Sequence, residues 1–155
     1  MRPAGQPKPG ARAGQTRPMN PLTVHRWLYE WTGGRVGGRL PGAVPVALLQ
    51  TTGRKTGRAR TVPLVYARDG GDYVFVASNN GSERPPGWLF NAEARPEVRL
   101  RVGRLQMLGT ARVVPAGDPA YPRLWRLVND NNHGRYDRYQ ARTSRPIPVL
   151  VVTPS

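Results

Sequence analysis

The chain has 155 residues with 24 Lys and Arg against nine Asp and Glu, a formal net charge of +15, and no cysteine. This length fits one domain around a single core. The lack of cysteine excludes disulfides, thiolate catalysis and cysteine zinc sites, and two histidines among scattered acids argue against any metal. No apolar run nears the roughly 20 residues of a membrane helix. No secretory segment opens the chain, so we expect a cytoplasmic protein.

The positive charge is uneven along the chain. Residues 1–60 hold eleven Lys or Arg and one acid, whereas residues 61–155 hold thirteen Arg and eight acids. Such an excess suits an anionic partner, which could be nucleic acid, an acidic membrane surface or an anionic cofactor.

The N-terminal part differs in composition from the rest. Residues 1–20 are mostly Pro, Gly, Arg, Gln and Ala, which predicts a disordered basic tail. Apolar residues then recur at helical spacing and predict an amphipathic helix over residues 21–31: Val24, Trp27, Leu28 and Trp31. This helix either packs on the domain or, with the tail, gives residues 1–31 a peripheral contact with an anionic membrane at its inner leaflet. A glycine-rich linker over residues 32–42 follows.

The remaining sequence predicts a β-rich domain. Apolar runs bounded by turn residues predict about six strands, over residues 44–50, 60–67, 73–77, 97–102, 105–114 and 147–152. Short helices are expected over residues 86–94 and from Asp118 onward. Because βαβ alternation is absent, the predicted fold class is mainly β with short helices (α+β). We expect an antiparallel barrel that forms a single domain over residues 21–155.

The most informative segment is the cationic turn, residues 51–60, between the first two predicted strands. Its ten residues include four cations, three threonines and two glycines. Backbone N–H groups beside glycine, hydroxyls and cations together bind phosphate or carboxylate groups, so we interpret the turn as an anion site. The alternative is a solvated loop with spare arginines. A Walker loop is excluded because the glycines are too close together and no helix follows.

Two further segments could face a ligand. The polar run from Ser78 to Ser82 ends a strand, and its N–H groups could hold the edge of a heterocycle or an oxyanion, although such a run also suits a plain loop. The segment from Gly87 to Asn91 opens a helix, whose N-terminus attracts anions.

Tyr136 and Tyr139 stand three residues apart, with His133 on the same side, on what could be a turn of helix. They could donate a proton or hydrogen bond to a carbonyl or nitro oxygen, or one of them could simply pack in a surface turn. No Ser-His-Asp arrangement is arguable from the sequence. Any catalysis would therefore depend on a cofactor.

The order and spacing of these segments resemble the deazaflavin-dependent nitroreductase family of actinobacteria. The shared pattern covers roughly residues 20–153 and consists of Thr52-Gly53-Arg54-Lys55-Thr56-Gly57-x-x-Arg60-x-x-Pro63-Leu64, Ala77-Ser78, Trp88-x-x-Asn91-x-x-Ala94-x-Pro96 and Tyr136-x-x-Tyr139 before Arg145-x-Ile147-Pro148-Val149. The resemblance implies a split β-barrel of the FMN-binding type. It also implies an oxidoreductase with reduced coenzyme F420 as hydride donor and FMN as the less favoured alternative. Coenzyme F420 is an 8-hydroxy-5-deazaflavin with a phospholactyl-oligoglutamate tail, and this polyanionic tail suits the cationic turn.

The resemblance also implies roles for individual residues. The implied cofactor-binding residues are Arg54, Lys55, Thr56, Arg60, Thr61, Val62, Pro63, Leu64, Val76, Ala77, Ser78, Asn79, Gly87, Trp88, Leu89, Phe90, Asn91 and Tyr136. The implied catalytic residues are Ser78, Tyr136 and Tyr139, and the implied substrate-lining residues are Val65, His133, Tyr136 and Tyr139. No metal is implied.

The electron acceptor implied is a small molecule: a quinone, a nitroaromatic compound or an enone. Asn79, His133 and Val65 stand where the family pattern usually has a lysine and two tyrosines, which favours quinones and other activated double bonds over bulky nitroaromatics. Two other functions stay open, namely a basic nucleic-acid-binding barrel and an FMN- or haem-binding carrier without turnover. No specific nucleic acid is expected, and either a monomer or a homodimer is compatible.

Overall fold

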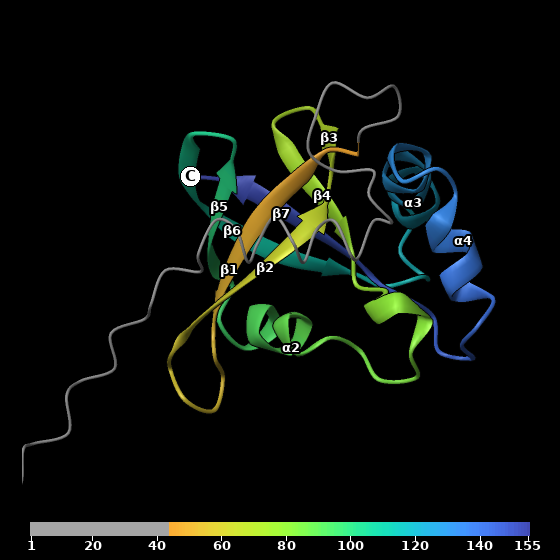
Figure 1. Cartoon of the computed structure of the whole chain (residues 1–155), viewed down its shortest axis with the longest axis horizontal. Coiled ribbons are helices and arrows are strands. Elements are labelled where there is room, and N and C mark those ends of the chain that lie inside the picture. The colour runs from red at the N-terminus through yellow and green to blue at the C-terminus, as the bar shows by residue number, and fades with distance from the viewer. Residues whose placement is uncertain (1–43) are drawn as a thin grey trace, which may run out of the picture.

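The structure is a computed structural model, and residues 44–155 are described. The tail predicted over residues 1–20, the helix over 21–31 and the linker over 32–42 lie outside the described residues. The described part contains seven strands, one short 3-10 helix and three α-helices (Figure 1). In chain order they are β1 (Val46–Thr52), β2 (Ala59–Val65), β3 (Ala67–Asp69), β4 (Asp72–Val76), η1 (Asn79–Gly81), α2 (Gly87–Ala94), β5 (Glu97–Val102), β6 (Leu105–Val114), α3 (Tyr121–Asn131), α4 (Arg135–Gln140) and β7 (Val149–Pro154).

All seven strands belong to one sheet of order β2-β1-β5-β6-β7-β4-β3, and each neighbouring pair is antiparallel. The predicted class, mainly β with short helices, is therefore confirmed. The sheet has one strand more than the expected six or so, because the strand predicted over residues 60–67 is divided at Tyr66. The Tyr66 N–H donates to Pro45 O at 3.1 Å, and after it the chain leaves β1 and pairs with β4.

The break at Tyr66 forces the sheet to close. β2 and β3 stand at opposite ends of the strand order, yet only Tyr66 separates them along the chain. Consecutive Cα atoms are about 3.8 Å apart, so the two edges of the sheet must meet there, and β2 contacts β4 across the closure. An antiparallel sheet closed in this way is a barrel, and closure removes the exposed edges.

Alternation along the strands divides the core in two, because successive side chains point to opposite faces. The inner cluster fills the barrel and receives α2; its members include Leu49, Leu64, Tyr73, Phe75, Leu89, Leu100 and Leu150. The outer cluster lies between the sheet and the α3–α4 pair and includes Val65, Val74, Val114, Leu124, Val128 and Tyr136. Figure 1 shows α2 beneath the β1–β2 end of the barrel and α3 with α4 at its side. The two faces therefore carry separate helices.

Tyr121 fastens α3 to the segment before β7. Its hydroxyl donates to Ile147 O at 2.6 Å. Burial raises the pKa of Tyr121 to about 12, and the nearby charge of Asp137 adds to the effect. The folded protein thus favours the neutral phenol.

We expect Tyr121→Phe to lower the free energy of unfolding by about 1 kcal/mol at neutral pH, the net worth of one hydrogen bond. The folded pKa is raised, so this contribution is fully present below the ordinary value of 10.0 and is lost as the pH rises through about 12. Urea unfolding at a series of pH values should show a flatter alkaline loss of stability in the variant. An unchanged alkaline slope would contradict this assignment.

Candidate functional site

The cationic turn is held by its own backbone. The Gly53 N–H donates to Arg58 O and the Gly57 N–H to Gly53 O, both at 2.7 Å. A Cβ on residue 53 would lie 2.8 Å from Thr56 Oγ1, and Gly57 has a φ of +69°, which side chains rarely adopt. The two glycines are therefore required by the shape of the turn.

Asn91 of α2 fixes the turn against the helix. Its Oδ1 accepts from Arg54 N at 3.1 Å and from Arg54 Nη1 at 3.0 Å, and its Nδ2 donates to Thr51 Oγ1 at 3.3 Å. The Arg54 guanidinium also lies 5.1 Å from the centre of the Phe90 ring and reaches Gly87 O at 3.4 Å. Arg54 thus mainly anchors the turn to α2.

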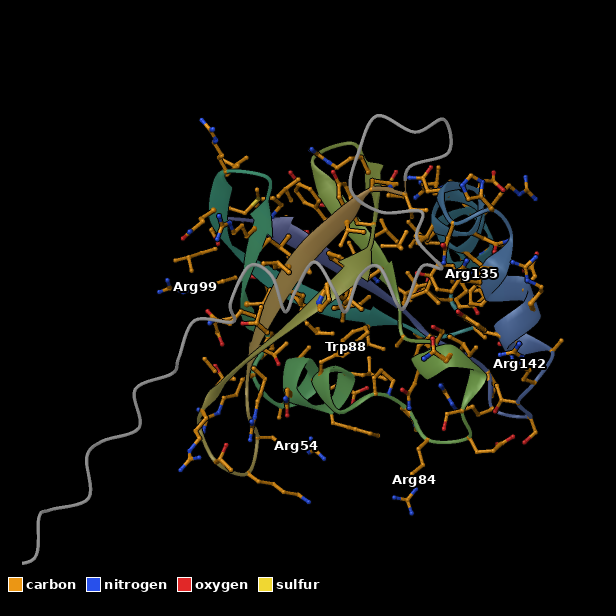
Figure 2. The ribbon with its side chains drawn as sticks, in the orientation of Figure 1. Arg54, Arg84, Trp88, Arg99, Arg135 and Arg142 are labelled. Atoms are coloured by element: carbon orange, nitrogen blue, oxygen red, sulfur yellow. The ribbon has the colours of Figure 1, made fainter. Side chains whose placement is uncertain are left out.

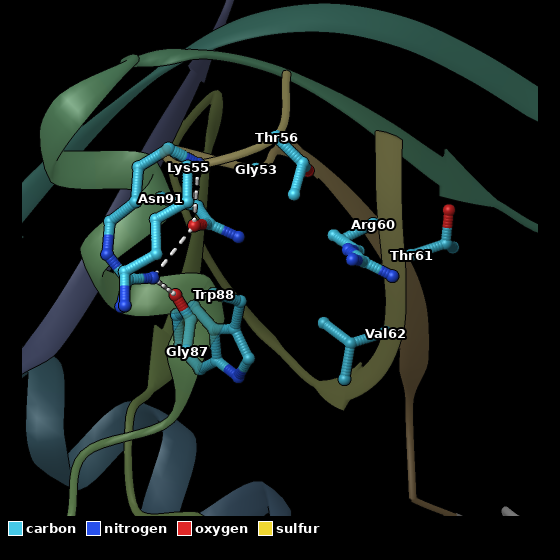
Figure 3. A pocket seen from close by; sticks show the side chains of 10 residues that line it. Gly53, Lys55, Thr56, Arg60, Thr61, Val62, Gly87, Trp88 and Asn91 are labelled. Atoms are coloured by element: carbon cyan, nitrogen blue, oxygen red, sulfur yellow. Dashed lines mark hydrogen bonds between the residues drawn. The ribbon is translucent and has the colours of Figure 1, made fainter. Parts of the chain in front are cut away.

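A cavity of about 390 Å³ lies between the turn, β2 and the start of α2 (Figure 3). Its lining is Gly53, Arg54, Lys55, Thr56, Arg60, Thr61, Val62, Gly87, Trp88 and Asn91. Figure 3 places Arg60, Thr61 and Val62 on one side and Gly87, Trp88 and Asn91 on the other. Nine residues predicted to bind a cofactor are thereby brought together, with Gly53 as an addition.

The cavity combines charge with apolar surface. Within residues 44–155, the side chains of Lys55 and Arg60 have no hydrogen-bond or ion-pair partner, and both residues are exposed. Val62 and Trp88 add apolar surface to the same space. Two cations without a counter-ion beside such surface fit a ligand that joins an anionic group to a flat ring.

The other predicted cofactor residues do not line this cavity. They are Pro63, Leu64, Val76, Ala77, Ser78, Asn79, Leu89, Phe90 and Tyr136. Ala77 and Ser78 follow β4 and are buried, whereas Asn79 is exposed and its Nδ2 donates to Arg84 O at 2.8 Å. Leu64 and Leu89 pack in the inner cluster.

The predicted substrate residues lie elsewhere, beside α3 and α4. Tyr136 and Tyr139 belong to the outer cluster with Val65, and their rings meet edge to face at 6.1 Å. His133 is exposed after the end of α3, with a φ of +54°. Burial, with a smaller effect of Tyr139, raises the pKa of Tyr136 far above its ordinary value, so its phenol stays protonated at neutral pH. Tyr136 could therefore serve only as a hydrogen-bond donor or acceptor, not as a base.

The sequence analysis did not identify Gly53 as a lining residue of the cavity. It also missed the hydrogen bond from Arg145 Nη2 to Ser78 O at 2.9 Å. Gly53 stands inside the motif and could have been included from its place between Thr52 and Arg54.

Within residues 44–155, no group of three His, Asp or Glu side chains is placed to hold a metal ion. None of the helices described there combines the length and apolarity needed to cross a bilayer.

Comparisons with known proteins identify the family and the fold. A family model for F420H2-dependent quinone reductases matches residues 21–154. The chain is 52% identical over 132 residues to an F420H2-dependent quinone reductase of Mycobacterium tuberculosis, a match that covers 85% of this chain and 89% of that relative. The solved structure of an F420H2-dependent reductase, FDR-A, has a TM-score of 0.62 at 36% identity, covering 70% of this chain and 93% of that chain. Another solved structure, described as a domain-swapped dimer, has a TM-score of 0.63 at 34% identity over 84% of this chain and 94% of that chain.

The closed sheet and these relatives define a split β-barrel oxidoreductase. Within that class, the chain belongs to the F420H2-dependent quinone reductase family. The predicted resemblance to deazaflavin-dependent reductases and the predicted split barrel are confirmed. The comparisons give no support to the nucleic-acid-binding barrel or to the FMN or haem carrier.

We expect Asn91→Ala to lower the free energy of unfolding by about 1–3 kcal/mol, because the half-buried Arg54 N–H would lose its acceptor and the buried Thr51 Oγ1 would lose its donor. The turn would also loosen, so binding of pyrophosphate as a probe should weaken by about tenfold. Chemical unfolding and calorimetric titration measure the two effects. Asn131→Ala is the matched control, since it removes one amide hydrogen bond, to Tyr66 O, on α3. Equal pyrophosphate affinity in both variants would contradict the role of Asn91.

Proposed function

We propose that this protein reduces quinones with hydride from reduced coenzyme F420. The observation that carries the proposal is the cavity between the turn and α2, where two cations without partners in the described residues adjoin the apolar surface of Val62 and Trp88. Coenzyme F420 joins a flat ring to a polyanionic tail, which is the combination that such a cavity suits. FMN carries one phosphate and would use less of the cationic surface.

The cavity residues have distinct parts in this proposal. Lys55, Thr56 and Arg60 bind the phosphate and the tail, and Arg54 holds the turn in place through Asn91. Thr61 and Val62 of β2, with Gly87 and Trp88 of α2, would form the walls for the ring. Leu64 and Leu89 would support these walls from the inner cluster, and Pro63 and Phe90 stand next to them along the same two elements. The segment that begins at Val76, the last residue of β4, and runs through Ala77 and Ser78 to Asn79 would border the ring edge, and Tyr136 beside α3 would lie on its far side.

The coenzyme, when bound, supplies a hydride, and the chain supplies orientation and a proton. Transfer of the hydride and of one proton to the quinone would give the hydroquinone, and solvent would return the proton to the donating hydroxyl. Ser78, Tyr136 and Tyr139 are the proposed donors to the acceptor oxygen. Tyr136 would give only a hydrogen bond, whereas Ser78 or Tyr139 would give a hydrogen bond or the proton, because a hydroxyl stabilises the negative charge that develops on that oxygen. Val65 and His133 are the remaining proposed residues of the substrate side. Nitroaromatics and enones are secondary acceptors in this proposal.

The setting of the reaction is also part of the proposal. We expect the protein to act in the cytoplasm. Residues 1–31 carry five Lys or Arg and one Glu, so contact with the inner leaflet would come through them. The molecule acts as a monomer or a homodimer, and size-exclusion chromatography with light scattering distinguishes the two.

The direct test of activity is anaerobic oxidation of reduced coenzyme F420 by menadione, followed at the absorbance of the oxidised deazaflavin. We expect the rate to depend on the protein and to saturate with the concentrations of both reduced coenzyme F420 and menadione. Turnover with FMN hydroquinone alone, or none with any quinone tested, would overturn the proposal.

Lys55→Ala should weaken binding of the coenzyme by about tenfold or more, because one unpaired cation of the cavity is lost. The effect should lie in KM and Kd, with kcat changed little. Arg104→Ala, in the β5–β6 turn away from the cavity, is the control with the same change in net charge. Equal affinities in the two variants would show that general charge, not this site, attracts the coenzyme.

Tyr139→Phe should lower kcat by at least about tenfold and leave the coenzyme Kd unchanged, since only the hydroxyl is removed. Tyr73→Phe is the control, a buried tyrosine of β4 whose hydroxyl accepts from Arg68 Nη1 at 3.0 Å. Single-turnover kinetics with menadione separate hydride transfer from binding. A variant with the parent's kcat would remove Tyr139 from the proposed donors.

A further inference from the structure

Arg145, in the segment before β7, binds the turn that carries Ser78. Its Nε donates to Ser82 O at 2.8 Å, and its Nη2 donates to Ser78 O at 2.9 Å and to Ala77 O at 3.3 Å. One planar guanidinium therefore bonds three backbone carbonyls of residues 77–82. Lysine could not reproduce this pattern, because its donors lie on one rotating atom.

The environment of Arg145 is costly for a charge. Burial lowers its pKa, and Glu83 partly offsets this effect. Its Nη1 is shielded from solvent and has no hydrogen-bond partner within residues 44–155. Shielded charges are seldom kept for stability alone, since apolar residues of similar size often serve as well. The three carbonyl contacts therefore point to a need for one particular shape of the turn.

Other contacts join the same turn to α4. A Cβ on residue 81 would lie 2.6 Å from Tyr139 O, and Gly81 has a φ of +78°, so only glycine allows this approach. Glu83 accepts from Ser144 N and Ser144 Oγ, both at 3.2 Å. The turn and α4 are thus packed as one unit, which Figure 1 shows as the green and blue segments beside each other.

The segment that carries Arg145 is itself fixed to α4. Gln140 Nε2 donates to Arg145 O at 2.8 Å, and Gln140 Oε1 accepts from Ile147 N at 2.9 Å. Arg142, labelled in Figure 2 at the same end of the molecule, lies 5.6 Å from the centre of the Tyr139 ring. Arg145 is therefore anchored on the side of Tyr139 and reaches across to the side of Ser78.

We propose that Arg145 is a positioning residue. It holds Ser78 and Tyr139 in a fixed relative position, so that both hydroxyls can donate a hydrogen bond to the same oxygen of the quinone. The inference rests on the proposed quinone reduction. In that proposal the coenzyme tail binds at the cationic turn, for which no contact with Arg145 is found, and residues 76–79 border only the edge of the ring. Loss of the guanidinium should therefore slow the reaction far more than it weakens binding of the coenzyme.

The test compares Arg145→Ala, Arg145→Lys and the control Arg123→Ala in the full chain. Arg123 forms an exposed ion pair with Asp69 at 2.6 Å, so its loss removes an arginine contact away from the turn. Three quantities are measured: hydrogen–deuterium exchange of residues 77–84 without ligands, the Kd of oxidised coenzyme F420, and kcat with menadione.

For Arg145→Ala we expect faster exchange over residues 77–84, a Kd within about twofold of the parent and a kcat lower by at least about tenfold. Arg145→Lys should recover only part of the kcat, and Arg123→Ala should match the parent in all three quantities. The inference would be overturned if Arg145→Ala kept the parent's kcat, or if its affinity for the coenzyme fell by as large a factor as its kcat. In either case the proposed function would still stand. A parent that neither binds nor oxidises the coenzyme would overturn both.

Discussion

The single-residue link at Tyr66 is the constraint on which the rest of the structure depends. β2 and β3 lie at opposite ends of the strand order, so a link of one residue obliges the sheet to close. Because the sheet closes, both faces of β2 are buried near its C-terminal end. Leu64 packs inside the barrel and Val65 packs outside, under the helices α3 and α4. The same strand begins at the cationic turn, so the barrel fixes where the charges of the turn lie.

The charges of the site are divided between structure and binding. The Arg54 guanidinium donates to Asn91 and lies over the Phe90 ring, and these contacts hold the turn against α2. Lys55 and Arg60 keep no partner within the described residues and face the cavity. Like charges held together are unfavourable unless an anion relieves them. The folded turn therefore retains a free energy that a polyanionic ligand can release on binding.

The local parts of this picture could be predicted from sequence, and the long-range parts could not. Glycines, hydroxyls and cations within ten residues predicted the turn, and apolar runs bounded by turn residues predicted most strands. Tyr66 carries no local signal of a break, because the division depends on which partner strand is available. The bond between Arg54 and Asn91 spans 37 residues, and that between Arg145 and Ser78 spans 67. Such pairings arise from the closed sheet and leave no periodic pattern.

The preference of the cavity for coenzyme F420 over other ligands tests the proposed function most directly. Purified protein would be titrated with oxidised coenzyme F420 by fluorescence, with FMN and a short single-stranded DNA titrated in parallel at two salt concentrations. We predict saturable binding of the deazaflavin, at least about tenfold tighter than that of FMN, and no specific binding of DNA. Tighter binding of FMN, or DNA binding that weakens steeply with salt while the deazaflavin does not bind, would contradict a coenzyme F420 site in this cavity.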